Sequence, residues 1–149
     1  MTAIEESELA RVIEASAAEV LETMFFTPVL DEPEPASAPP PVLCASLTFA
    51  GDPPGTLQID IAEAAARNLA ADFLGSDASE VSAEHAQEVA FELANMLCGS
   101  ILSRVEPNAH FDLSSPEPVD RLQGKQAVSR QLYLPSGTLT VSVQLGDVP

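Results

Sequence analysis

One long stretch, from Ser82 to Arg104, most constrains what this chain can fold into. It reads SAEHAQEVAFELANMLCGSILSR and contains no proline. At about 100° per residue, its apolar residues gather on one broad side of a helix: Ala86, Val89, Ala90, Leu93, Leu97 and Ile101. Such a stripe is typical of a helix that packs against a core. The pattern therefore predicts a long helix over residues 82–104.

The opposite side of this predicted helix carries two carboxylates, an amide and a glycine. A spacing of i, i+4, i+7 and i+11 places them within an arc of about 60°, and together they form the polar strip: Glu88, Glu92, Asn95 and Gly99. Apolar residues border this strip: Phe91, Cys98 and Leu102. A rigid helix holds such groups in fixed geometry better than a loop does. The polar strip is therefore a candidate functional site, although the same spacing also occurs on helix faces that are only solvated.

The chain is strongly acidic, with 23 acidic residues against 6 basic ones and a formal net charge of −17. Nucleic acid is disfavoured as a partner because phosphate binding needs a basic surface. An anionic membrane is disfavoured for the same reason. A partner with a basic patch is favoured, because complementary charge speeds encounter. The alternative is that the acidic excess only confers solubility.

Length and cysteine content favour a small intracellular domain. The 149 residues suggest one domain, residues 1–149. Cys44 and Cys98 lie far apart, and His85 and His110 are single. No metal site is therefore expected, and free thiols in a reducing cytosol are favoured. The N-terminal MTAIEESE lacks the features of a signal peptide, and no apolar run reaches about 18 residues, so we expect a cytoplasmic protein.

The N-terminal part of the chain predicts a second long helix. Apolar residues recur at helical spacing over residues 3–26, and Pro28 is expected to end this helix. Its last apolar residues are expected to lie in the core rather than in a binding patch: Met24, Phe25 and Phe26. Residues 31–41, DEPEPASAPPP, predict an acidic Pro-rich surface loop. A connecting role is favoured for this loop, and a docking role is the alternative.

The remaining segments predict a sheet. Alternating apolar residues indicate strands over residues 42–50, 56–61, 124–134 and 138–145. Asp60 and Glu63 have the spacing of a capping box for a helix over residues 61–74, which Gly75 is expected to end. We therefore expect an α/β (α+β) fold in which two long helices pack on one face of a mainly antiparallel sheet.

An internal duplication is visible in the sequence. GTLQIDI from Gly55 is matched by GTLTVSV from Gly137, and EVLETMF from Glu19 is matched by ELANMLC from Glu92. This predicts two copies of a helix–hairpin unit. Glu92 and Asn95 of the second copy correspond to Glu19 and Glu22 of the first. The Glu-x-x-Asn pair therefore occurs in one copy only.

The spacing Glu92-x2-Asn95-x22-Pro118 resembles the signature of the CheC/CheX/FliY family of chemotaxis phosphatases. Three sequence words carry the same resemblance: VLETMF at 20–25, ELANMLCGSIL at 92–102 and LSSPEPV at 113–119. A single Glu-x-x-Asn site is more similar to the CheX branch than to two-site CheC. Glu88 departs from the Asp or Ser usual in the family at this position. Pro116 lies close enough to Pro118 that either could be the family proline.

The resemblance implies that the chain hydrolyses the aspartyl phosphate of a CheY-type response-regulator receiver domain. Asn95 would orient the attacking water and Glu92 would anchor the receiver's active-site Lys. The phosphorylated Asp and the Mg²⁺ would belong to the receiver, so the chain would need no cofactor of its own. The resemblance also implies a homodimer, for which the strands over 125–145 are candidates to join the sheets.

Alternatives remain at the level of function and of single residues. A CheX-like module that docks on a receiver or a motor component without hydrolysis is the second hypothesis. Glu88, Phe91, Gly99 and Pro118 are the candidate partner-binding residues. Phe91 and Leu102 are candidates for a docking rim or for small packing contacts inside a dimer. A glycine within a helix costs about 1 kcal/mol, and a tight contact inside this protein is favoured over close approach of a partner as the explanation of Gly99.

Overall fold

The computed structural model describes residues 6–32, 42–51, 54–108, 110–117, 127–135 and 137–145. Its helices are α1 (Glu6–Met24), α2 (Glu63–Leu74) and α3 (Ala83–Val105), with a short 3-10 turn, η1 (Ala78–Glu80). Its strands are β1 (Val42–Ala50), β2 (Gly55–Ala62), β3 (Asp112–Leu113), β4 (Val128–Leu134) and β5 (Gly137–Leu145). The predicted residues 3–5, 33–41, 124–126 and Pro118 lie outside the described residues.

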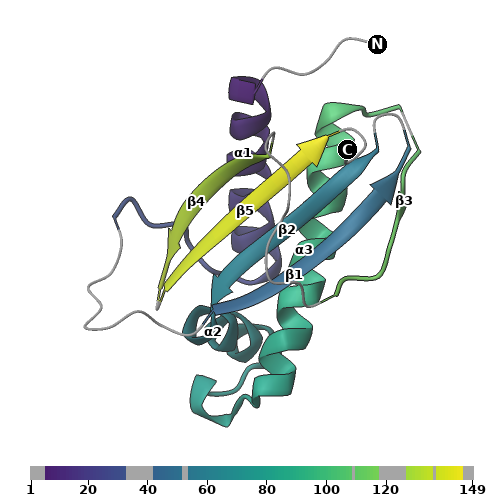
Figure 1. The fold of residues 1–149 in the computed structure, drawn as a ribbon. Coiled ribbons are helices and arrows are strands. Elements are labelled where there is room, and N and C mark those ends of the chain that lie inside the picture. Colours follow the sequence, from purple (N-terminus) through teal and green to yellow (C-terminus); the bar gives the residue numbers. More distant parts are fainter. Residues whose placement is uncertain are drawn as a thin grey trace.

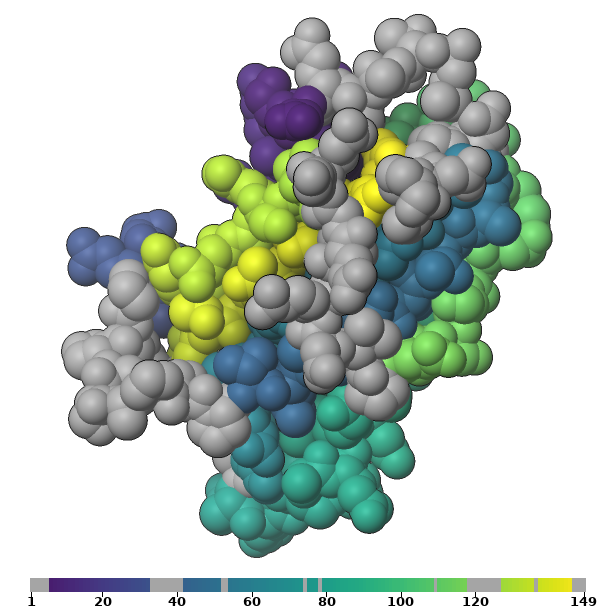
Figure 2. All heavy atoms as spheres, viewed as in Figure 1, coloured from purple at the N-terminus to yellow at the C-terminus, as the bar shows by residue number. Residues whose placement is uncertain are grey.

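The described strands form one antiparallel sheet in the order β3-β1-β2-β5-β4. The long helices α1 and α3 lie side by side behind this sheet, and α2 crosses its lower end (Figure 1). Seen from the same side as spheres, α2 and the start of α3 project beyond the lower end of the strands (Figure 2). The predicted α+β architecture, with the helices on one face of an antiparallel sheet, is confirmed.

The core lies between the sheet and the helices, because the strands alternate as the sequence predicts. One face of the sheet contributes buried aliphatic residues from each long strand, including Leu47, Ile59, Ile61, Leu139 and Val141. These residues share one core cluster with the buried faces of the helices, which include Ile13, Leu21, Leu93, Leu97 and Ile101. The helices are therefore held against the sheet by burial of apolar area, the main favourable term in folding.

The two hairpins meet about an approximate twofold axis in the middle of the sheet. β2 and β5 are the central strands, and each is flanked by the other strand of its own hairpin. In the register of β2 and β5, Ile59 lies opposite Val141. These two residues also occupy equivalent positions in the repeated words GTLQIDI and GTLTVSV. The sequence echo therefore coincides with the spatial symmetry of the sheet.

The helix α2 begins differently from the prediction. Its N-cap is Ala62, which makes no side-chain capping bond, so the predicted capping box is wrong. Asp60 instead accepts a hydrogen bond from the Gln58 side-chain amide on the sheet, at 3.0 Å. The predicted end of the helix is confirmed, because Gly75 adopts the left-handed conformation with φ of 71°.

The end of α1 also differs from the prediction. The helix ends at Met24, before Pro28, and the chain turns through Phe26, which has a φ of 53°. Phe25 is buried in the core as expected. Met24 and Phe26 are 43% and 74% exposed, so the prediction that they are core residues is wrong. Met24 is the last residue of α1 and faces outward, and Phe26 lies beyond the end of the helix, where helical periodicity no longer applies.

Candidate functional site

The helix α3 is a rigid support for the polar strip. At its start, the Ser82 hydroxyl accepts a hydrogen bond from the backbone N–H of His85, a standard N-cap. Its apolar side packs against α1, α2 and β1. The predicted stripe is buried except for Val89, which is half-buried and still packs on the core. The side chains of the strip are therefore carried by a helix that is capped at its start and packed along its inner face.

The polar strip faces outward. Glu88, Glu92 and Gly99 are exposed, and Asn95 is half-buried. Within the described part of the chain, the side chains of Glu88, Glu92 and Asn95 have no hydrogen-bond or ion-pair partner. Two free carboxylates and one partly restrained amide thus point away from the body of the protein. Such groups remain available for an approaching surface.

The apolar residues bordering the strip are more buried than predicted. Cys98 is 1% and Leu102 is 2% exposed, so Leu102 belongs to the core and is not a docking rim. Burial raises the pKa of the Cys98 thiol to about 12. Phe91 is half-buried and packs against the core cluster. Of the three border residues, Phe91 alone reaches the surface.

Gly99 lies in open space. A Cβ atom built at this position would meet no described atom within 4 Å. The predicted tight contact inside the protein is therefore wrong. A glycine in the middle of α3 leaves a flat patch of helix backbone one turn beyond Asn95, where a second molecule can approach closely.

The equivalent position of the first copy is occupied by an ion pair that sequence reasoning missed. Arg104 donates to the Glu19 carboxylate at 3.0 Å and to the buried Ser16 hydroxyl at 2.8 Å. Glu19 corresponds to Glu92, and its carboxylate is used to join α1 to α3. Glu22 stands in place of Asn95 and offers no amide. The first copy therefore has no free carboxylate at the position of Glu92 and no amide at the position of Asn95.

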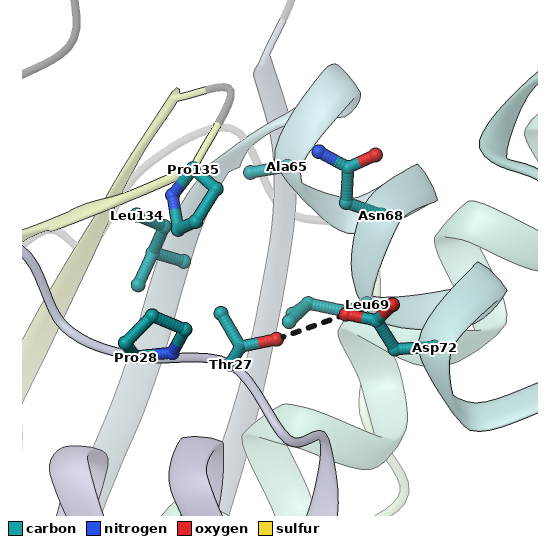
Figure 3. A pocket seen from close by; sticks show the side chains of 8 residues that line it. All are labelled: Thr27, Pro28, Ala65, Asn68, Leu69, Asp72, Leu134 and Pro135. Carbon is teal, nitrogen blue, oxygen red and sulfur yellow. Dashed lines mark hydrogen bonds between the residues drawn. The ribbon is translucent and has the colours of Figure 1, made fainter.

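The polar strip is a helix face and not a cavity. A pocket of about 250 Å³ lies elsewhere, between the segment after α1, the helix α2 and the turn after β4 (Figure 3). Among the described residues, no group of His, Cys, Asp and Glu is suited to hold a metal ion. No described helix is both long and apolar enough to cross a membrane.

Of the two candidate prolines, only Pro116 is described, because Pro118 lies outside the described residues. Pro116 is half-buried in a segment that runs beside β1, where Glu117 and Ser46 exchange two backbone hydrogen bonds of 2.8 Å. This places the proline segment beside β1, a strand against which α3 packs.

Residues 43–134, more than half of the chain, match the family model described as chemotaxis phosphatase CheX. The chain belongs to the CheX family. CheX from Vibrio vulnificus is 18% identical, with a TM-score of 0.69 over 96% of this chain and 99% of the other. FliY from Thermotoga maritima is 13% identical, with a TM-score of 0.63 over 99% and 93%. No curated protein matches the chain.

A further similar structure is a CheX-CheY-BeF3-Mg²⁺ complex from Borrelia burgdorferi. Its matching chain is 17% identical, with a TM-score of 0.69 over 92% of this chain and 97% of the other. At these identities the likeness establishes the CheX fold. The family model adds membership of a chemotaxis phosphatase family, and its match includes the whole polar strip.

Proposed function

We propose that this CheX-family protein hydrolyses the aspartyl phosphate of a CheY-type receiver domain. The observation that carries the proposal is the pair Glu92 and Asn95, one turn apart on the outer face of α3, with side chains that have no partner in the described structure. The chain offers the positioning groups, and the receiver would bring the phosphoryl group. Because the receiver would supply the reacting group, the site on this chain can lie on a helix face and does not need a pocket.

Asn95 is proposed to orient the attacking water. An acyl phosphate is already reactive, so its hydrolysis mainly requires a water held in line with the bond that breaks. The Asn95 amide both donates and accepts hydrogen bonds. Its half-buried position restricts its rotamers more than full exposure would. Removing one positioning group of this kind costs about 10²–10³ in rate.

Glu92 is proposed to anchor the receiver through its active-site Lys. The Glu92 carboxylate is exposed and unpaired in the described structure, so a partner ammonium does not have to displace an existing bond. The phosphorylated Asp and the Mg²⁺ would come with the receiver. The similar structure from Borrelia burgdorferi, a complex of CheX with CheY, BeF3 and Mg²⁺, supports this kind of partner.

The second candidate is a docking module that binds a receiver without hydrolysis. The observation in its favour is Glu88, which is exposed one turn before Glu92. A second free carboxylate there strengthens attraction to a basic surface. It also lies close enough to compete with Glu92 for the same Lys and so shift the register of the docked receiver.

We also propose that the protein acts in the cytoplasm as a homodimer that pairs through the β4 edge. β4 is at the end of the described sheet, whereas β5 lies between β2 and β4. Of the two late strands, β4 alone has an edge at which a second sheet can pair. The proposed dimer contact therefore involves β4 and not the whole segment 125–145.

The deciding experiment measures the decay of a phosphorylated CheY-type receiver with Mg²⁺, with and without substoichiometric protein. The wild type is expected to accelerate the decay, and Asn95→Ala is expected to lose about 10²–10³ of that acceleration while still binding the receiver. Glu92→Ala is expected to weaken binding itself. Glu22→Ala is the matched control, because it removes a side chain at the equivalent position of α1.

Two outcomes would decide against the proposal. If Asn95→Ala dephosphorylates the receiver as fast as the wild type, the assigned mechanism is wrong. If a receiver binds to the strip but its phosphate lifetime is unchanged, the docking module is the correct function. In that second case, Glu88→Ser or Glu88→Asp tests whether the longer carboxylate is what prevents hydrolysis.

A further inference from the structure

Exposed apolar side chains cluster where α1 and α2 end. The large exposed apolar residues of the described chain include Met24, Phe26 and Phe73. Two contacts bring these helix ends together. The rings of Phe25 and Phe73 lie 6.0 Å apart, and the Thr27 hydroxyl donates to Asp72 at 3.3 Å. Phe26 adjoins Thr27 in the chain and Phe73 adjoins Asp72, so we define the exposed residues at these two helix ends, Met24, Phe26 and Phe73, as the α1–α2 patch.

Phe26 combines an unfavourable backbone conformation with an exposed side chain. Its φ of 53° lies in the left-handed region that disfavours bulky side chains. This turn lets the Thr27 N–H return to the Leu21 carbonyl at 2.9 Å, a task that glycine performs without strain. The side chain is 74% exposed, so it contributes little burial in return. A strained and exposed aromatic residue points to contact with another molecule.

A small pocket adjoins this patch. Figure 3 shows Pro28, Leu134 and Pro135 on one side of it, the α2 residues on the other, and the Thr27–Asp72 hydrogen bond at its lower end. Its volume of about 250 Å³ is below the roughly 300–1,000 Å³ of pockets that hold small-molecule ligands. It has the size for one inserted side chain, with apolar walls and a carboxylate at the rim.

The charge around the patch selects the kind of side chain. Residues 12–66, which include the end of α1, contain no Lys or Arg. The next cation along the chain, Arg67, is held by Glu63 and by the Val81 carbonyl. Glu22, Asp31 and Asp72 are exposed near the ends of the two helices. Within the described structure the patch is therefore acidic, apolar and without a cation of its own.

We propose that the α1–α2 patch is a second docking surface, and that it takes a protein segment with an Arg or Lys beside an apolar residue. The alkyl stem of the basic side chain lies in the pocket against Leu69 and Leu134, and its charged head reaches Asp72. The neighbouring apolar side chain packs on Phe26 and Phe73. This surface involves none of the polar-strip residues and does not depend on the phosphatase proposal.

The first test asks whether Phe26 is needed for folding. Phe26→Gly relieves the left-handed strain, and the midpoint of thermal unfolding is expected to rise by about 2–8 °C. Far-UV circular dichroism checks that α1 is unchanged. A midpoint lowered by several degrees would mean that the ring supports the fold, and that would overturn the proposal.

The second test measures binding with a defined probe. Acetyl-Leu-Arg-Leu-amide is titrated into the ¹⁵N-labelled protein and followed by NMR. Saturable shifts are expected at Thr27, Asp72 and Phe73, and acetyl-Leu-Glu-Leu-amide is expected to produce none. Asp72→Asn and Phe26→Gly are each expected to weaken binding of the Arg peptide at least about fivefold. Asp77→Asn is the matched control, because it makes the same charge change on an exposed residue outside the pocket.

Three results would contradict the docking surface. They are equal binding of the Arg and Glu peptides, equal weakening by Asp72→Asn and Asp77→Asn, and shifts that map to the polar strip instead of the patch. Absence of saturable binding up to several millimolar peptide also overturns it. Loss of phosphatase activity in Asn95→Ala leaves these readouts unchanged, so the two proposals fail independently.

Discussion

At the scale of single residues, neighbouring positions along the polar strip differ sharply in how buried they are. Asn95 keeps a half-buried amide, Gly99 leaves bare backbone, and Cys98 between them in the helix turns into the core. Adjacent positions on α3 therefore have opposite roles, because about 100° of rotation per residue separates core from surface. Substitutions at these positions are expected to separate stability from function.

Gly99→Ala is expected to stabilise the protein and impair docking. Ala is about 1 kcal/mol better than Gly inside a helix, and a Cβ at this position meets no described atom. The midpoint of thermal unfolding should rise by about 2–4 °C. Receiver binding and dephosphorylation should fall, since the added methyl group stands where a partner would contact the backbone. Full activity in the stabilised variant would show that no partner approaches at Gly99.

Cys98 is expected to be unreactive in the folded protein. Burial raises the pKa of its thiol to about 12 from an ordinary 9.0, so the reactive thiolate is scarce at neutral pH. Between pH 9 and 12 the unfolded chain releases this proton first. The free energy of unfolding should therefore fall by about 1.4 kcal/mol per pH unit in this range. Chemical denaturation across this range, compared with Cys98→Ala, measures the effect, and an identical pH dependence in the variant would contradict it.

At the scale of elements, Arg104 joins α1 to α3 through two kinds of contact. Its ion pair with Glu19 is partly exposed, with 33% and 60% of the two side chains accessible. Such pairs contribute about 0–1 kcal/mol. Its bond to Ser16 is different, because Ser16 is 0% exposed. A buried hydroxyl that loses its partner costs about 1–3 kcal/mol.

Arg104→Ala is therefore expected to destabilise the protein more than Glu19→Ala, by about 1–2 kcal/mol. Urea unfolding of both single variants measures the difference. The double variant Ser16→Ala with Arg104→Ala should recover part of the loss, because the buried hydroxyl is then absent. Equal effects of Arg104→Ala and Glu19→Ala would mean that the ion pair and not the Ser16 bond carries the contact.

At the scale of the whole molecule, the outer edge of β4 is where the proposed dimer would pair. The Leu30 N–H donates to the Tyr133 carbonyl at 2.7 Å, so Tyr133 turns its backbone groups away from β5. Alternation along a strand makes Gln131 point the same way. The N–H of Gln131 is therefore on the outer edge of β4, where a second sheet would pair.

Gln131→Pro is expected to convert the proposed dimer to a monomer. Proline removes the outward N–H and leaves the bonds between β4 and β5 intact, as edge strands tolerate. Size-exclusion chromatography with light scattering measures the mass, and circular dichroism checks the fold. Leu132→Pro is the contrasting variant, because it breaks the inner ladder and should unfold the hairpin. A Gln131→Pro protein that remains dimeric would place the interface elsewhere.

The sequence by itself determined the elements and the single candidate site. Strand alternation predicts β1 with the observed bounds, and helical periodicity predicts α3 to within one residue at each end. Both signals are local, because the side-chain direction repeats every 2 or about 3.6 residues whatever the rest of the chain does. The same periodicity places Glu88, Glu92 and Asn95 on the outer face of α3.

Only the tertiary structure decided which contacts these residues make. The pairing of Arg104 with Glu19 spans 85 positions of the sequence, and no local pattern encodes it. Burial of Leu102, open space at Gly99 and exposure of Phe26 depend on how α1, α2 and the sheet surround each position. Such packing is set by groups far apart in sequence, which explains why the elements were predictable and the neighbours of each candidate site residue were not.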